Sequence, residues 1–519
     1  MKKTILTLTF FLITIYITRA QNGIIDKTFG NNGFITEKAD IYLSEVNMLI
    51  QEDGKIIITG TVDYSAGNLD IFVIRYNMDG SIDGTKIINV DNKDNHASGL
   101  AIESSGKILI TGYTWIGSDS YVIRLNRNLT FDNSFGQQGI VRFDFSEKSS
   151  DIERIKNIVV YNDGEYYVSG DAKIEGITKD LDQFIFKLTS SGFVDNSFNN
   201  GKVLYLGDYG YNNFNKSLLI QGNELIVAGY SKSSDYTYLD LFYIYGNGSL
   251  DKYKYFGINT VNGCYANDFI ITNNNEIIAT GPINRGTSDS DVFVAKFNYE
   301  GDIDDNFGHN GLKYYDIFDA KKLDEPFSIT QLPNHNYLIA GSKFEEKWSW
   351  ESSYAFTIIE NGEINNSFGE NPVYGITNWN LEGSKLDQAI VARYNPVNNM
   401  IYIAGKTYGD DDKNLYLTRL TSNVNATRNI NDAYGKMIIS PNPVRHTAIL
   451  NFPNSQDGLV SIKIISQTGQ TVYKTTKQLS NKIVLNNLNI KSGLYIIKAS
   501  SKNKEYISKI VVLGNNTEK

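Results

Sequence analysis

Cysteine is almost absent from the 519-residue sequence, in which Cys264 is the only one. A single cysteine cannot form an internal disulfide, so stability must come from a large apolar core, and we expect Cys264 to be buried and unreactive. Proline and methionine are scarce too, with 8 and 5 residues, whereas 34 tyrosines, 26 phenylalanines and 44 glycines are present. No segment keeps an amphipathic helical period. The composition therefore favours an all-β protein of strands and tight turns.

Residue groups typical of catalysis are missing as well. The four histidines show no metal-ligand spacing, and no phosphate-binding loop occurs. His309 and His335 fall in expected turns. The acids of Asp410-Asp-Asp-Lys413 are consecutive, without the spacers of a calcium loop, which favours a solvated loop. We therefore expect no metal, no cofactor and no catalytic residues.

A single apolar run is long enough to suggest targeting. It covers residues 5–17, and its 13 residues fall short of the roughly 20 that a membrane-spanning helix needs. Lys2 and Lys3 precede the run, and Ala20 follows it as a small residue at the expected cleavage site. This pattern is typical of a cleaved signal peptide at 1–20. We expect an exported protein without a transmembrane segment.

Charge divides the chain into two parts. The net charge is −9 overall, but residues 435–519 hold 12 basic and 3 acidic residues, and the first 20 residues add three basic ones. Residues 21–434 are therefore strongly acidic, at −21. This contrast indicates two units of different purpose, and the acidic body argues against a nucleic-acid partner.

A repeat organises the acidic body. Asp53-Gly-Lys-Ile-Ile-Ile-Thr-Gly60 recurs as Ser105-Gly-Lys-Ile-Leu-Ile-Thr-Gly112 and Asp163-Gly-Glu-Tyr-Tyr-Val-Ser-Gly170, and in four weaker copies. The closing glycines lie 52 to 64 residues apart, a period typical of repeat architectures. They are Gly60, Gly112, Gly170, Gly229, Gly281, Gly341 and Gly405. Each unit fits four strands, which in the second unit are predicted at 98–103, 107–113, 121–126 and 139–143.

A second motif, Asp-x-Ser-Phe-Gly-x-x-Gly, predicts how the ends of the body meet. It recurs, with variations, after the third strand of four units, at 131–139, 194–201, 303–311 and 364–369, and once more at 25–33, directly after the signal peptide. Units one and four have a short turn instead, and their intervals are the two of 52 residues. The seventh unit ends after its third strand. Residues 26–36 therefore supply its missing fourth strand, and the sequence predicts a seven-bladed β-propeller over 21–425, closed by the N-terminal strand without an open edge.

These two motifs resemble the delta-60 repeat family, a β-propeller-type repeat of about this period. The resemblance covers most of 23–423 and implies a fold but no activity. Units four, five and six depart from it at the Asp-Gly step. An arginine characteristic of the family's third strand is present at Arg75, Arg124 and Arg419, with lysine at Lys187 and Lys296.

After a polar linker at 426–435, the pattern changes to short strands typical of a small Ig-like β-sandwich at 436–513. Ser440-Pro-Asn-Pro-Val444, Gln467-Thr-Gly-Gln-Thr-Val472, Ser492-Gly-Leu-Tyr495 and Lys509-Ile-Val-Val-Leu513 resemble the type A sorting domain of the type IX secretion system of Bacteroidetes-type bacteria. The resemblance implies the secretion machinery as a partner and a secreted or outer-membrane surface location. Residues 514–519 extend beyond the usual ending of that family.

Aromatic residues give the only candidate site. In a propeller the connections between strands two and three share one face with those between strands four and one, and here these connections vary most. We predict a ligand-binding set on them, since exposed aromatics on rigid scaffolds are typical binding anchors. It consists of Trp115, Trp348, Trp350, Trp379, Tyr64, Tyr113, Tyr236 and Tyr408, with Tyr209, Tyr211 and Tyr238 nearby. The alternative is that these rings are local packing.

The leading functional hypothesis is a non-enzymatic binding or adhesion module for a glycan or a protein. One alternative is a glycan-degrading enzyme, which would hold two carboxylates at the propeller axis. A passive structural scaffold is the other.

Overall fold

The structure is a computed structural model, which divides into two compact units at 1–424 and 425–519. It describes residues 22–38, 46–63, 69–114, 119–145, 151–162, 164–178, 180–207, 211–233, 236–258, 264–286, 289–318, 323–346, 349–369, 375–409 and 413–422 of the first unit. Of the second unit it describes 438–440, 447–451, 459–466, 471–478, 482–486, 488, 490–491, 493–500 and 505–512. The predicted signal peptide and linker lie outside the described residues.

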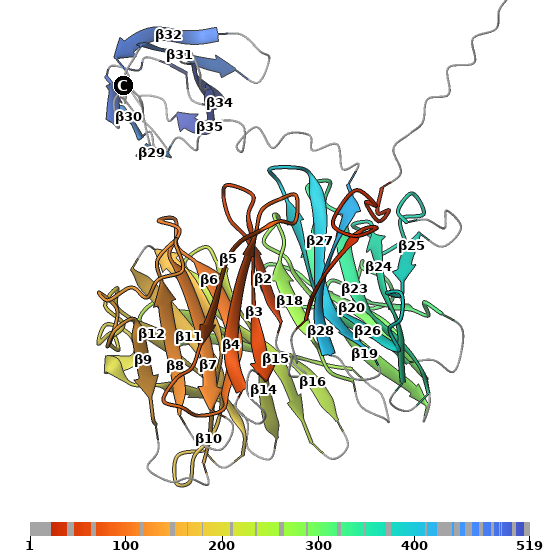
Figure 1. The fold of residues 1–519 in the computed structure, drawn as a ribbon. Helices are drawn as coiled ribbons and strands as arrows, with labels where there is room; N and C mark the ends of the chain where they lie inside the picture. Colours follow the sequence, from red (N-terminus) through yellow and green to blue (C-terminus); the bar gives the residue numbers. More distant parts are fainter. Residues whose placement is uncertain are drawn as a thin grey trace, which may run out of the picture. The chain divides into compact units, whose positions relative to one another are not determined.

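The first unit repeats an antiparallel set of four strands (Figure 1). The sets of the fifth and sixth repeats are linked into one eight-stranded sheet by a parallel pairing of Ser290 with Leu323. The second repeat forms β6 (Asn95–Ile102), β7 (Ile108–Thr114), β8 (Ser120–Leu125) and β9 (Ile140–Phe143), paired in that order. These bounds agree with the predicted strands to within three residues. No α-helix occurs among the described residues, which confirms the all-β prediction.

The other repeats follow the same order. The first strands are β2 (Asn47–Ile50), β10 (Ile152–Asn162), β14 (Asn212–Gln221), β18 (Asp268–Ile271), β22 (Leu323–Gln331) and β26 (Leu386–Asn395). The second strands are β3 (Ile56–Asp63), β11 (Glu165–Lys173), β15 (Glu224–Lys232), β19 (Ile277–Gly286), β23 (Tyr337–Glu346) and β27 (Met400–Tyr408). The third strands are β4 (Leu69–Tyr76), β12 (Asp182–Leu188), β16 (Thr237–Tyr245), β20 (Asp289–Phe297), β24 (Ser349–Ile358) and β28 (Lys413–Thr421). The fourth strands are β5 (Ile82–Ile88), β13 (Leu204–Leu206), β17 (Leu250–Gly257), β21 (Leu312–Tyr315) and β25 (Ile376–Trp379), and a short 3-10 turn, η1 (Asn199–Gly201), precedes β13.

The N-terminal strand completes the last of these sheets. β1 (Phe34–Lys38) pairs antiparallel with β28, in a register that runs from Phe34 opposite Thr418 to Lys38 opposite Asn414. The sheet order is β1-β28-β27-β26, so β1 takes the fourth position. The strand predicted from the stray insert motif is therefore present and lies where the motif placed it.

The closing glycine of six repeats is required by a close approach of a backbone carbonyl oxygen. A Cβ added to Gly170 would lie 1.9 Å from the carbonyl oxygen of Arg154, and one added to Gly229 would lie 2.0 Å from that of Phe214. In both sheets the first strand bulges beside the glycine, at Lys156 and at Lys216, where one residue has no partner in the register. Only a residue without a side chain fits there, which explains why the glycine recurs.

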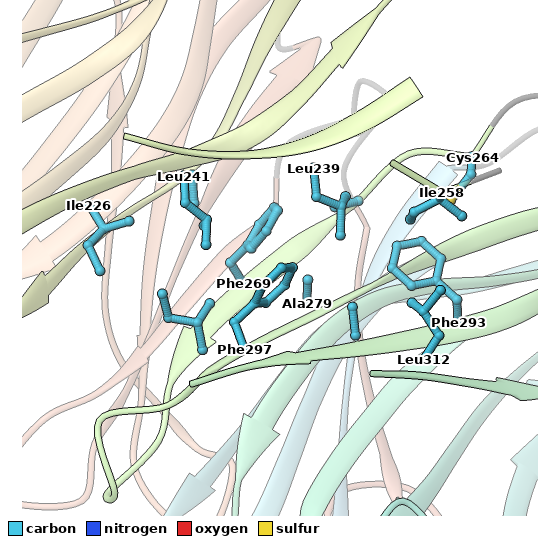
Figure 2. Packing of buried hydrophobic residues seen from close by; sticks show 14 of the residues in the cluster. Ile226, Leu239, Leu241, Ile258, Cys264, Phe269, Ala279, Phe293, Phe297 and Leu312 are labelled. Carbon is cyan, nitrogen blue, oxygen red and sulfur yellow. The ribbon is translucent and has the colours of Figure 1, made fainter. Parts of the chain in front are cut away.

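Apolar clusters fill the space between neighbouring sheets. The cluster between the fourth and fifth sheets packs Ile226 and Leu239 against Phe269 and Phe293 (Figure 2). Cys264 belongs to this cluster and is buried, as predicted. The first strands also touch their neighbours in sequence, from β2 through β6, β10, β14, β18 and β22 to β26, and β26 in turn contacts β2.

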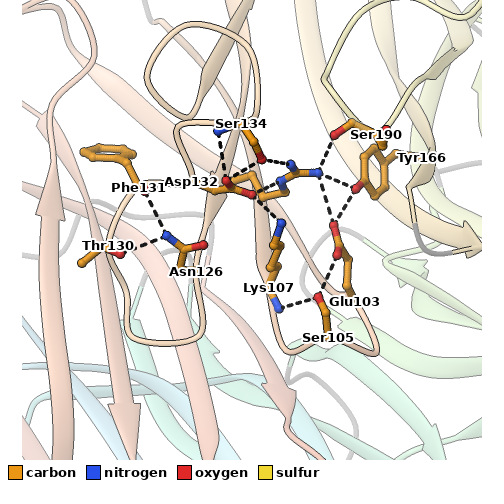
Figure 3. Close-up of polar contacts among 11 residues, drawn as sticks. Glu103, Ser105, Lys107, Asn126, Thr130, Phe131, Asp132, Ser134, Tyr166 and Ser190 are labelled. Atoms are coloured by element: carbon orange, nitrogen blue, oxygen red, sulfur yellow. Dashed lines mark hydrogen bonds and ion pairs between the residues drawn. The ribbon is translucent and has the colours of Figure 1, made fainter. Parts of the chain in front are cut away.

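A buried polar network ties the insert motif to the strand before it (Figure 3). The Nε of Arg124 donates to Asp132 of the insert at 2.7 Å, and its Nη1 donates to the hydroxyl of Tyr166 at 2.7 Å and to the carbonyl of Ser190 at 2.6 Å. Tyr166 and Ser190 belong to the next repeat. The third-strand cation therefore joins two neighbouring sheets as well as its own turn.

The pairing of a third-strand cation with an insert aspartate recurs in other repeats and once at the chain's N-terminus. Lys187 lies 3.1 Å from Asp195, and Lys296 lies 3.5 Å from Asp304, each an insert aspartate of its own repeat. In the seventh sheet the partner comes from the other end of the unit, because Arg419 donates from Nη2 to Asp26 at 2.6 Å. Asp26 thus takes the place of the insert aspartate that the seventh repeat lacks.

The second unit has two sheets of its own. One is β29 (Ile438–Ser440), β30 (Ala448–Asn451) and β33 (Lys482–Leu485); the other is β32 (Thr471–Gln478), β31 (Leu459–Ser466), β34 (Gly493–Ser500) and β35 (Glu505–Val512). Leu450 and Ile483 of the first sheet share one apolar cluster with Ile462 and Ile497 of the second. The short strands predicted for this region are present as β29 to β35. No helix among the described residues is long and apolar enough to cross a membrane.

Candidate functional site

Half of the predicted aromatic set cannot be placed by its side chains. Trp115, Trp348 and Tyr64 lie outside the described residues. Trp350 lies in β24 opposite Phe344, but its side chain is not described. Their role as ligand-binding residues stays a prediction.

Two other members are buried, so the expectation that their rings face solvent is wrong. Tyr113 is 6% exposed and stacks on His96 with ring centroids 5.2 Å apart, and Trp379 is 5% exposed within an apolar cluster. Both residues lie near or at the ends of strands, β7 and β25, where the rings turn into the space between sheets. Tyr408 ends β27 in a half-buried position, and burial raises the pKa of its hydroxyl to about 12.

Tyr236 is the described member that faces solvent, and it belongs to a larger group. Its ring is 56% exposed and lies 6.3 Å from that of Tyr238. The ring of Tyr238 lies 5.8 Å from Tyr211 and 5.7 Å from Tyr255, and Tyr255 lies 5.6 Å from Tyr253. We call these five residues the tyrosine platform.

The fold explains why these rings meet. In an antiparallel sheet the end of the second strand, the start of the third and the end of the fourth lie at one edge, together with the connection that leads to the first strand. Tyr211 precedes β14, Tyr236 and Tyr238 lie at the start of β16, and Tyr255 lies near the end of β17. The platform therefore occupies the face on which the variable connections were predicted to meet.

The platform is fixed from below. Tyr253 stacks on Phe242 with centroids 4.4 Å apart, and its hydroxyl donates to Asp240 at 3.0 Å. A Cβ on Gly257 would lie 3.1 Å from the ring of Tyr238, so glycine leaves room for that ring. Tyr255, at the other edge, is 65% exposed. Tyr236 and Tyr255 are therefore exposed, while Tyr253 is held in place.

Sequence reasoning missed Tyr253 and Tyr255 because it searched the connections and not the strands. A signal was present in the alternation Tyr253-Lys-Tyr255 on the fourth strand. That strand has 8 residues in this unit, where the insert is replaced by a short turn, but 3 or 4 residues in repeats two, three, five and six, which carry the insert. The longer strand provides the extra surface.

A cavity of about 510 Å³ lies between the first strands of the seven sheets. Asp268 is the one carboxylate among the described residues that line it, so the acid pair expected for a glycan-degrading enzyme is not seen in that lining. Three lining residues, Lys156, Lys216 and Arg393, are basic. No group of three or more His, Cys, Asp or Glu side chains suited to a metal ion occurs in the described parts of the chain.

The class of protein is thus an all-β chain of repeated four-stranded sheets that ends in a small β-structured tail. Comparison with family models agrees: residues 51–85 and 103–135 match the beta-propeller family described as Domain of unknown function (DUF5122), and residues 438–513 match the Secretion system C-terminal sorting domain. Both resemblances predicted from the sequence are confirmed, and the second indicates export to the cell surface or the medium through the type IX system.

Similar solved structures are distant. The sialidase of Trypanosoma rangeli is 8% identical with a TM-score of 0.37, over 93% of this chain and 87% of that one. Polysaccharide lyase Uly1 is 10% identical with a TM-score of 0.37, over 79% and 94%. An exo-beta-1,3-galactanase from Phanerochaete chrysosporium is 10% identical with a TM-score of 0.28, over 75% and 81%. At such TM-scores these likenesses carry no argument about function. No curated relative matches the chain.

Proposed function

We propose that this protein is an exported seven-bladed β-propeller, closed by its N-terminal strand, that binds a carbohydrate through the tyrosine platform. The propeller would occupy 21–425, and the tail at 436–513 would serve export. The tryptophan-bearing connections, which the sequence predicts for the same face, would extend the binding surface.

Four contacts support the closed ring. The first strands touch in sequence and the last of them, β26, touches β2. β1 pairs with β28, and Asp26 binds Arg419. The amide of Asn395 in β26 also donates to the carbonyl of Gly54, in the turn of the first sheet, at 2.8 Å. The first and last sheets are therefore joined by both backbone and side-chain contacts.

The observation that carries the binding proposal is the exposure of Tyr236 and Tyr255 at the two edges of a connected group of rings. Aromatic faces bury the C–H face of a sugar ring, and the phenol hydroxyls at their rims can bond to sugar hydroxyls. Because Tyr253 is held by Phe242 and Asp240, little side-chain entropy is lost when a ligand is bound. A neutral polysaccharide needs no countercharge, which suits a surface built from phenols.

Affinity electrophoresis of the purified protein in gels that contain xylan, mannan or dextran tests this proposal. We expect retardation by at least one polysaccharide, and we expect Tyr236→Ala and Tyr255→Ala each to weaken binding about 5- to 20-fold, the loss typical of one stacked ring. Tyr299→Ala is the matched control, because Tyr299 is 48% exposed but lies outside the platform.

Equal retardation of all variants would remove the platform as the site. A protein partner captured through the same two tyrosines, with no retardation by any polysaccharide, would replace the carbohydrate with a protein ligand.

A further inference from the structure

The central cavity has the size of a ligand pocket. Its volume of about 510 Å³ falls in the range of roughly 300 to 1,000 Å³ that is usual for small-molecule sites. Residues from the first strands of all seven repeats line it, among them Asn47 and Asn157, and so does Asn267, which directly precedes β18. The amides of these three asparagines donate to the neighbouring sheets, at Ser98, at Asn215 and Lys216, and at Pro326. The wall is therefore polar and preformed.

The bulge of the first strand decides which side chains enter this wall. In five sheets one residue lies between register partners at the same place, namely Ser98, Lys156, Lys216, Phe327 and Ile390. Only two of them are charged, and they are neighbours, on β10 and β14. Among these five sheets, the bulge position is basic only in these two neighbours. The fold shared by the sheets does not require a basic residue there, which indicates a function of the two lysines at this place.

Two of the three cations in the wall form no ion pair with a carboxylate in the part of the chain that the structure describes. Lys156 forms an ion pair with Asp171. In contrast, no carboxylate of the described residues lies within ion-pair distance of Lys216 or Arg393. The Nζ of Lys216 donates to Asn267 at 3.4 Å, and Nη1 of Arg393 donates to the carbonyl of Ala392 at 2.8 Å and to the hydroxyl of Ser328 at 3.4 Å. Both cations are thus held by neutral acceptors.

The nearby acids are already engaged. Asp268 accepts a hydrogen bond from the amide of Ile329 at 3.0 Å, and Glu325 accepts one from the hydroxyl of Tyr265 at 2.7 Å. Burial raises the pKa of both carboxyls, although the charge of Arg393 opposes this at Asp268. Burial also lowers the pKa of Lys216 to about 8, and the neighbouring Lys156 adds to that shift, while the charges of Asp171, Glu325 and Asp268 oppose it. Lys216 therefore has acids nearby but forms no ion pair with any of them.

We propose that the cavity binds a small molecule with an oxyanion, a carboxylate or a phosphate, through Lys216 and Arg393. Such a ligand would form direct ion pairs with Lys216 and Arg393, which the acids of the described residues do not, and charge-assisted hydrogen bonds to lysine and arginine are the strong class of such contacts. This site is separate from the tyrosine platform.

Isothermal titration calorimetry of the full chain in low-salt buffer tests the proposal with four probes: glucuronate, citrate, inorganic phosphate and neutral glucose. We expect at least one anion to bind and glucose not to bind. Comparison of glucuronate and citrate with phosphate shows whether the site prefers a carboxylate or a phosphate. Lys216→Gln and Arg393→Gln each weaken binding about 10-fold or more, as the loss of one charge-assisted contact does. Asp268→Asn, which removes the lining carboxylate, tightens it.

Lys254→Gln is the control, because Lys254 lies on the outer strand β17 and forms an ion pair with Asp302. Tyr236→Ala leaves anion binding unchanged, so failure of the platform and failure of the cavity are distinguishable. A second measurement avoids folding problems in the variants: the anion that binds slows acetylation of Lys216 in the wild-type protein, measured by mass spectrometry.

The proposal is overturned if none of the three anions binds, if Lys216→Gln binds as tightly as the Lys254→Gln control, or if acetylation of Lys216 is not slowed.

Discussion

Replacement of Asp26 by alanine tests whether the N-terminal strand closes the proposed ring or is only loosely attached to it. The carboxylate accepts from Nε of Arg419 at 3.0 Å and from Nη2 at 2.6 Å, and it also accepts from the amide and hydroxyl of Thr28 at 3.0 and 2.6 Å. Arg419 in turn donates to the carbonyl of Met78, in the first sheet. Loss of Asp26 therefore weakens contacts of both the first and the last sheet.

The expected cost follows from the burial of the pair. Both side chains are mostly buried, with 12% and 14% exposed, so water screens the pair only in part. A hydrogen bond to a charged group contributes about 1.5–3 kcal/mol, and the alanine variant also leaves a buried guanidinium without its partner. We expect a loss of about 3 kcal/mol, which corresponds to a fall of about 3 to 6 °C in Tm for a unit of this size.

Differential scanning calorimetry checks this value, with Asp79→Ala as the matched control. Asp79 accepts from the amide and hydroxyl of Ser81 at 2.9 and 2.7 Å, the same turn contacts that Asp26 makes, but it forms no ion pair of the described set. Burial works to raise the pKa of Asp26, but the hydrogen bonds from Thr28 and Arg419 outweigh it and hold the pKa below 3.8. The stabilisation is thus present at neutral pH and is lost as the pH falls below this value, so the two variants converge in acid. An Asp26→Ala variant with the same Tm as Asp79→Ala at pH 7 would refute the proposed closure.

Three further outcomes follow from buried groups. Burial, helped by nearby aspartates, raises the pKa of Glu153 from 4.5 to about 7, so the protein loses stability as the pH rises through this interval. Glu153→Gln should therefore be more stable than wild type by about 2 kcal/mol at pH 8 and equal to it at pH 4. Urea unfolding at the two pH values measures this difference. Gly229→Ala should cost about 3 kcal/mol or more, since its Cβ would meet a carbonyl oxygen at 2.0 Å, whereas Gly246→Ala, whose nearest atom lies at 3.5 Å, should melt as wild type does. Cys264 is buried and burial raises the pKa of its thiol, so a disulfide reagent should label it only after unfolding; labelling of the native protein would place it at the surface.

The repeat could be predicted because its signals are local. A two-residue turn, a glycine against a bulge and an aspartate beside a third-strand cation each leave a mark within a few residues of sequence. The partner of β1 was predictable for the same reason, since Asp26 lies in a motif whose other copies follow a third strand directly. Strand lengths were less predictable: β10 begins at Ile152 and runs for 11 residues, because pairing with β11 and not local pattern sets its end.

The candidate site was less predictable because exposure depends on packing between sheets. Tyr113 and Trp379 resemble Tyr236 in sequence, yet the ends of their strands turn inward and bury the rings. The cavity was missed for a related reason. Lys216 and Arg393 are 177 positions apart, and neither stands in a charged cluster of the sequence, so only the meeting of first strands brings them to one wall.

The pairing of β1 with β28 has a consequence for the order in which the protein is made. The strand that leaves the ribosome near the start must wait until the chain has grown by some 380 residues before its partner exists, as the pairing of Phe34 with Thr418 requires. Until then both the first strand and the last sheet present unpaired edges, which are prone to associate with other chains. In the propeller proposed above, this pairing is therefore a contact that can form only after the seventh repeat has been made.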